Sequence, residues 1–137
     1  NEEWNKSDEL YTKLISINDK DAQAYNNFAY SLVERDEDLD YALILAKKAV
    51  SISPNISAYL DTIGWIYYKL SDFNKAKEYI GKALIYDDTS SVILEHYGDV
   101  LISLNEIEEA LIFYKKALLL DEKNEKLRSK IISYESQ

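Results

Sequence analysis

The stretch SAYLDTIGWIYYKLSDFNKAKEYIGKALIYDD, residues 57–88, decides the fold, because its pattern returns in SVILEHYGDVLISLNEIEEALIFYKKALLLDE, residues 91–122. Gly64 falls on Gly98, and Ala76 falls on the alanine at the same place in the second copy, each a step of 34 residues. Repetition at this period is typical of proteins built from stacked supersecondary units, each of which buries its apolar side against its neighbours.

An earlier copy of the same unit precedes these two. Ala42 lies 34 residues before Ala76, whereas Ala29 lies 35 residues before Gly64. We therefore expect one extra residue in the polar turn ERDEDLD, residues 34–40.

Each unit contains two amphipathic helices. Apolar or small residues recur at the i, i+3, i+4 and i+7 spacing of one helix face at Leu60, Ile63, Gly64 and Tyr67, and a second such stripe begins at Phe73. The chain has only 3 glycines and 1 proline, too few for the many tight turns of a β-sandwich or barrel. The pattern thus predicts an all-α fold made of helix pairs.

This spacing resembles that of the tetratricopeptide repeat family, whose pattern runs large-x-x-Leu-Gly-x-x-Tyr, then Ala-x-x-x-Phe, then Pro. The matching residues of the three units are Tyr25, Phe28, Ala29, Leu32, Ala42, Ala46 and Pro54; Leu60, Ile63, Gly64, Tyr67, Ala76 and Ile80; and Leu94, Tyr97, Gly98, Leu101, Ala110 and Tyr114. Asp88 and Glu122 stand where proline is usual in the family. The resemblance implies a right-handed superhelical solenoid of antiparallel helix pairs with a concave inner face.

The repeat register describes one domain with five parts. We expect a leading half-repeat, three full repeats and a polar C-terminal capping helix, with the boundaries 1–21, 22–56, 57–90, 91–124 and 125–137. Because the chain contains no methionine, even at position 1, we expect it to be a fragment or a processed chain of a longer protein. Any targeting signal would then lie outside it, so no localisation is predicted.

The small residues have a steric reason. Gly64, Gly98 and Ala29 are expected where the two helices of a unit approach closely, and a bulky side chain there would cost roughly 1–3 kcal/mol by overpacking. In the turn before the last long helix, Asn105 is expected to cap that helix, with Glu108 three residues on as in a capping box.

Composition excludes several classes of function. The formal net charge of −9 should repel nucleic-acid phosphates and anionic membranes. No apolar run approaches the ~18 residues of a membrane-spanning helix, so no membrane insertion is expected. The absence of cysteine excludes disulfides, thiolate metal sites and cysteine nucleophiles. Richness in Lys, Ile, Asn and Tyr favours a bacterial source.

Catalytic and metal-binding motifs are also lacking. The segment DEDLDY from Asp36 begins like a calcium loop, but Tyr41 and Lys47 stand where such a loop needs glycine and glutamate. His96 is the one histidine, and with no nucleophile or ligand cluster around it in sequence, we expect a surface histidine. We therefore expect no enzymatic activity, no cofactor and no metal.

The aromatic residues of DTIGWIYYKL, residues 61–70, cannot all face one core. Tyr67 belongs to the core stripe, whereas Trp65 and Tyr68 lie on a second stripe that, by the family resemblance, lines the concave groove. The alternative is that Trp65 and Tyr68 only pack against an adjoining helix. The residues that we expect to line the peptide-binding groove are Asn26, Asn27, Tyr30, Asp61, Trp65, Tyr68, Lys69, Glu95, Asp99 and Ile102.

Two functions follow from the resemblance. The first is a protein–protein interaction module that binds a peptide or protein segment in the groove. Asp61, Glu95 and Asp99 argue against an acidic ligand and favour a partner with basic and with apolar or aromatic residues. The alternative is a structural spacer or assembly segment of a longer solenoid, with self-association through Trp4 and Tyr11.

Overall fold

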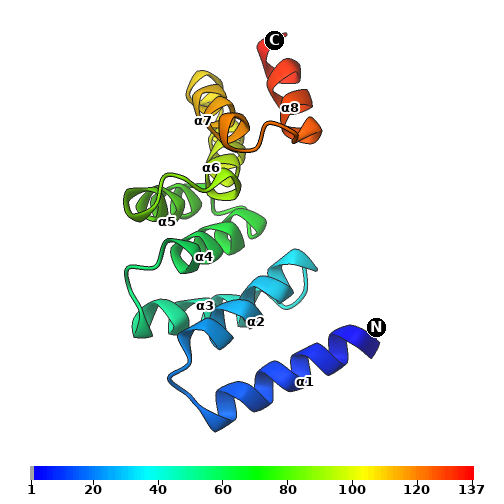
Figure 1. Ribbon diagram of the computed structural model, residues 1–137, viewed down its shortest axis with the longest axis vertical. Coiled ribbons are helices and arrows are strands. Elements are labelled where there is room, and N and C mark those ends of the chain that lie inside the picture. Colours follow the sequence, from blue (N-terminus) through cyan, green and yellow to red (C-terminus); the bar gives the residue numbers. More distant parts are fainter. Residues whose placement is uncertain (1) are drawn as a thin grey trace.

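The computed structural model describes residues 2–137, which form eight α-helices and no strand. The helices are α1 (Glu2–Ile17), α2 (Ala22–Glu34), α3 (Leu39–Ile52), α4 (Ser57–Lys69), α5 (Phe73–Tyr86), α6 (Ser91–Ser103), α7 (Ile107–Leu120) and α8 (Glu125–Glu135). They stack in chain order, with α1 at one end and α8 at the other (Figure 1). The predicted all-α solenoid is confirmed.

The most extensive helix–helix contacts are within the pairs α2–α3, α4–α5 and α6–α7, which we call the three repeats. Each pair is joined by a turn that has a residue of positive φ two positions after the first helix ends: Asp36 (52°), Ser71 (65°) and Asn105 (62°). In each turn two backbone N–H groups donate back into the last turn of the preceding helix, as in a Schellman motif. The repeats therefore end their first helices in the same way.

The first of these turns explains the 35-residue step. It contains a second residue with positive φ, Asp38 (43°), immediately before α3 begins at Leu39. The expected extra residue is thus accommodated by one more left-handed position, which aspartate tolerates better than most residues.

The expectation that Asn105 caps α7 is wrong. Asn105 closes α6, and its left-handed conformation leaves Glu106 at the cap position, where no side chain accepts a capping hydrogen bond. Asn105 resembles both an N-cap and a left-handed C-terminal residue in sequence, and here the second role prevails.

The small residues lie at close helix contacts, as predicted. A Cβ added to Gly64 would collide with Ile80 of α5, and one added to Gly98 would collide with the ring of Tyr114 of α7. Ala29 is completely buried at the corresponding place in the first repeat. The 34-residue spacing therefore reflects the near contact of the two helices in each unit.

The core runs along the stack. One cluster of buried side chains extends from α2 to α6, and a second, centred on Tyr114 and Leu127, joins α6, α7 and α8. The end helix α1 has no buried residue and is fastened by Arg35, whose guanidinium lies 2.7 Å from Asp8 and 4.8 Å from the Trp4 ring centre. Within residues 2–137, no helix is both long and apolar enough to cross a membrane.

Candidate binding groove

Trp65 is the middle ring of an aromatic stack between the first helices of two repeats. Its ring centre lies 4.5 Å from that of Tyr68, with an interplanar angle of 7°, and 3.8 Å from that of His96, with an angle of 12°. Two rings therefore stack on the indole, and Lys69 Nζ lies 5.6 Å from its ring centre, so little of its face is left open. Trp65 and Tyr68 are each half-buried, which agrees with a surface position that also packs against a neighbouring helix.

His96 is not the surface histidine expected from the sequence; that expectation is wrong. It is 9 % exposed, and its Nδ1 lies 3.0 and 3.1 Å from the two carboxylate oxygens of Asp61. Asp61 is itself 5 % exposed. The acid that the sequence placed in the groove for a ligand thus has a partner within the chain, since a buried carboxylate needs a hydrogen-bonded counterpart.

A second pair repeats this geometry one unit further along. Lys130 of α8 places its Nζ 2.7 Å from Glu95 and 2.9 Å from Asp99. Glu95 and Lys130 are 35 residues apart, as are Asp61 and His96. A groove acid of one repeat is therefore paired with a basic residue of the next, and the two pairs tie neighbouring first helices together.

The first position of this series has no such partner. Asn26 corresponds to Asp61 in the repeat register and is 8 % exposed. Its Oδ1 is buried without a hydrogen-bond partner in the part of the chain that the structure describes. Thr62, which corresponds to His96, donates its hydroxyl to the carbonyl of Ala58 instead. Buried amide oxygens are seldom left unpaired, so this end of the groove retains capacity for a hydrogen bond.

The carboxylates of Glu95 and Asp99 are also held by neighbouring side chains. Tyr114, 1 % exposed, donates its hydroxyl to Asp99 at 2.5 Å, and Asn124 Nδ2 lies 3.4 Å from Glu95. Burial, together with this hydrogen bond, raises the pKa of Tyr114. Burial alone would lower the pKa of Lys130, but its hydrogen bonds to Glu95 and Asp99 outweigh that effect and the pKa is raised, so Lys130 stays charged at neutral pH.

The remaining predicted groove residues differ in exposure. Asn27 and Lys69 are exposed, Ile102 is half-buried, and Tyr30 is 39 % exposed. Burial and a hydrogen bond to Glu34 raise the pKa of Tyr30 to about 12.

A cavity of about 290 Å³ lies beside the Trp65–His96 stack and the ion pairs of Lys130 with Glu95 and Asp99. It is lined by residues from α2, α4, α6 and α8, four helices of the first-helix type. The lining residues are Glu34, Trp65, Lys69, Val92, Glu95, His96, Asp99 and Lys130. Glu34, Val92, His96 and Lys130 are absent from the set predicted by sequence, and the 35-residue spacing of acid and base would have pointed to His96 and Lys130.

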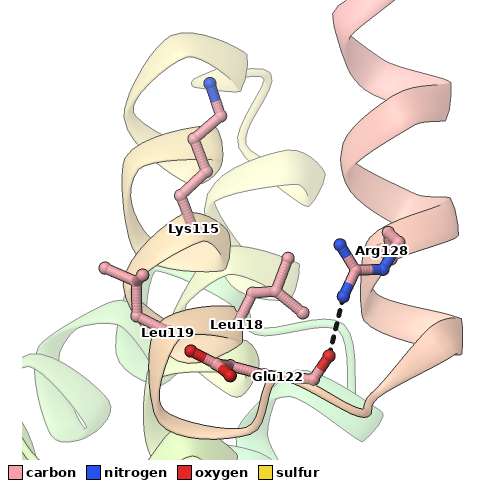
Figure 2. A pocket seen from close by; sticks show the side chains of 5 residues that line it. All are labelled: Lys115, Leu118, Leu119, Glu122 and Arg128. Atoms are coloured by element: carbon pink, nitrogen blue, oxygen red, sulfur yellow. Dashed lines mark hydrogen bonds between the residues drawn. The ribbon is translucent and has the colours of Figure 1, made fainter.

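Another cavity, of about 440 Å³, lies between α7 and α8 (Figure 2). Leu118 and Leu119 form its apolar part, and Lys115, Glu122 and Arg128 surround them. Arg128 donates to the backbone carbonyl of Glu122 at 2.7 Å, which fixes the turn between the two helices. None of these residues belongs to the predicted groove.

Comparison with known proteins agrees with the 34-residue repeat read from the sequence. The family model described as tetratricopeptide repeat matches residues 58–88 and 93–124. Anaphase-promoting complex subunit 3 of Schizosaccharomyces pombe is 30 % identical over 128 residues, which are 90 % of this chain but only 19 % of that protein. The chain therefore spans about a fifth of the length of this relative.

Solved structures show the same architecture. TTC0263, a thermophilic TPR protein of Thermus thermophilus, superposes with a TM-score of 0.81 at 24 % identity, over 95 % of this chain and 72 % of that one. YrrB, described as a TPR protein with an unusual peptide-binding site, superposes with a TM-score of 0.78 at 27 % identity, over 88 % of this chain and 62 % of that one. Residues 58–88 and 93–124 thus match tetratricopeptide repeats in sequence, and the stack of helix pairs has the fold of tetratricopeptide repeat proteins.

Proposed function

We propose that the chain is a protein-interaction module that holds a segment of a partner polypeptide along the cavity beside Trp65. The observation that carries the proposal is the aromatic stack, in which Tyr68 and His96 hold the indole rigidly with its edge beside a 290 Å³ cavity. A rigid aromatic group that does not have to be ordered on binding reduces the entropic cost of association. The peptide-binding site named for YrrB, at 27 % identity, supports the same kind of function here.

The charges around the cavity favour a partner with basic residues. Glu34, Glu95 and Asp99 contribute three negative charges, and Lys69 and Lys130 contribute two positive ones. Val92 and the Trp65 edge add apolar surface, so a segment that combines lysine or arginine with an apolar or aromatic residue matches the lining. The excess of negative charge is small, and we expect affinities on the order of micromolar.

A peptide array of basic–aromatic, acidic and neutral sequences tests this proposal, with binding of the selected peptides measured by fluorescence anisotropy. We expect capture of basic–aromatic peptides and about tenfold weaker binding by Glu34→Lys, which reverses a charge in the lining. Glu78→Lys, an exposed position of the second-type helix α5, is the matched control and should bind like the wild type. Selection of acidic peptides, or equal loss in both variants, would contradict the proposal.

A second candidate is an assembly segment of a longer solenoid. Leu10, Leu14 and Ile17 of α1 are 64 %, 47 % and 74 % exposed, so one side of this end helix is apolar and open. Of the residues expected to mediate self-association, Trp4 is 41 % exposed, whereas Tyr11 stacks on Phe28 at 5.3 Å and is partly used within the chain.

Sedimentation of the wild type against Leu14→Asp and Trp4→Asp tests this candidate. A dimer that both substitutions dissociate would support it. A wild type that sediments as a monomer at all concentrations would argue against self-association.

A further inference from the structure

Lys130 enters the groove from the last helix of the stack. Its Nζ lies between the carboxylates of Glu95 and Asp99, at 2.7 and 2.9 Å, and 5.6 Å from the ring centre of Tyr114. Two charge-assisted hydrogen bonds and an aromatic ring are what a protein commonly offers to a basic side chain of a ligand. Here the chain supplies that basic side chain itself.

Each acceptor in this site also has a hydrogen bond to a residue other than Lys130. The Tyr114 hydroxyl donates to Asp99, and the amide of Asn124 reaches Glu95. Tyr114 is part of the core at 1 % exposure, so its hydroxyl is fixed by packing. If Lys130 moved out, each carboxylate would keep one hydrogen bond that restrains it, and the place of the ammonium group would be open to another cation.

Helix α8, which carries Lys130, is also held to the rest of the stack by contacts that do not involve Lys130. Its two buried side chains, Leu127 and Ile131, pack into the cluster around Tyr114. A surface ion pair at 3.0 Å joins Lys115 of α7 to Glu135 of α8. Because these contacts keep α8 docked, the Lys130 side chain can be exchanged for another cation without loss of the fold.

Lys130 also borders the cavity beside Trp65. That cavity has Trp65 and His96 in its wall, and Glu95, Asp99 and Lys130 in the same lining. A basic side chain of a segment lying on the indole edge therefore meets the carboxylates that Lys130 occupies. The occupied site and the binding site are one continuous surface.

We propose that Lys130 is a built-in competitor for the partner's basic side chain, so that α8 limits the affinity of the groove for lysine- or arginine-containing segments. The inference rests on the proposed function, because it assigns regulation to the same cavity. A binding partner replaces the Lys130 ammonium between Glu95 and Asp99, and the displaced lysine turns toward solvent.

The test uses N-acetyl-L-arginine amide as the probe and N-acetyl-L-citrulline amide as its uncharged analogue of nearly the same shape. Binding is followed through the ¹H–¹⁵N shifts of the Glu95 and Asp99 backbone amides and of the Trp65 indole. We expect Lys130→Gln and Lys130→Met to bind the arginine derivative about tenfold more tightly than the wild type, as for the gain of one partly exposed ion pair. The citrulline derivative should gain nothing.

Lys126→Gln is the matched control, since Lys126 is an exposed lysine of the same helix. It removes the same charge from α8 and should leave the affinity for the arginine derivative unchanged. An equal gain in Lys126→Gln would show a general charge effect and overturn the inference. So would an equal gain for the citrulline derivative, or no gain in either Lys130 variant.

The two proposals fail separately. If the wild type captures basic–aromatic peptides and Glu34→Lys weakens them while the Lys130 variants bind arginine no better than the wild type, only the competition by Lys130 is refuted. If no peptide is captured but the Lys130 variants gain affinity for the arginine derivative, the competition stands and the peptide function falls.

Discussion

Replacing Trp65 separates its role in stability from its role in binding. In Trp65→Ala, two parallel stacks are lost, with Tyr68 at 4.5 Å and with His96 at 3.8 Å. Each aromatic pair contributes about 0.5–1.5 kcal/mol beyond the burial of area, so the two stacks account for about 1–3 kcal/mol. Because Trp65 is half-buried, loss of packing adds less than in a full core position.

We therefore expect Trp65→Ala to lower the free energy of unfolding by about 2–4 kcal/mol. A chain of 137 residues has a typical stability of about 7–20 kcal/mol, so the variant should remain folded. Trp65→Phe is the matched control: a phenyl ring can still lie between Tyr68 and His96, and the loss should be below about 1.5 kcal/mol. Urea unfolding followed by circular dichroism at a helical wavelength measures both.

Two results would refute this reasoning. A change below about 0.5 kcal/mol for Trp65→Ala would mean that the stack contributes nothing to the fold. Equal losses in Trp65→Ala and Trp65→Phe would mean that stacking is not the source of the stability. If Trp65→Phe keeps the stability but loses peptide capture, the indole edge itself contacts the partner.

Three further predictions concern the packing, an end helix and a titrating group. Gly64→Ala should lower the free energy of unfolding by about 1–3 kcal/mol, because its Cβ would collide with α5. Gly81→Ala is the control, because a Cβ there lies 3.7 Å from its nearest neighbour. It should be neutral or stabilise the fold by up to about 1 kcal/mol in the same urea assay. Arg35→Ala removes an 8 % exposed guanidinium that holds α1 to the stack. Amide hydrogen exchange should then accelerate in α1 while α4–α7 stay protected. Equal acceleration in all helices would contradict this prediction. The pKa of Tyr30, about 12 in the fold, lies above its ordinary value near 10, so the stability it contributes is fully present below pH 10 and is lost as the pH rises through 12. Glu34→Gln should lower that pKa toward 10, as measured by phenolate absorbance against the other tyrosines, and an unchanged value would refute the role of Glu34.

The sequence predicts the fold well because steric requirements recur at fixed spacing. Gly64 and Gly98 must be small wherever paired helices come close, and that demand is visible in the letters alone. The site is predicted less well because its chemistry depends on pairs from different repeats. The residues next to His96 or Lys130 in the sequence do not mark either one, and the signal lies in an acid 35 residues earlier. The rotation between successive helix pairs decides such contacts, and a single repeat does not encode it.

The pairing of acids and bases changes how the net charge of −9 bears on function. Composition alone indicates a groove that attracts basic partners through an unbalanced field, yet Asp61, Glu95 and Asp99 each have a partner within the chain. Exchange of Lys130 for a ligand cation leaves the number of ion pairs unchanged, so added salt should weaken equilibrium binding in the wild type only slightly. In Lys130→Gln the same ligand forms a new ion pair, and salt should weaken its binding more steeply. The reason is that salt screens the attraction between exposed charges, with a Debye length of about 8–10 Å near physiological ionic strength. The difference between the two salt slopes thus measures whether recognition at this end of the groove is an exchange of cations or a simple attraction.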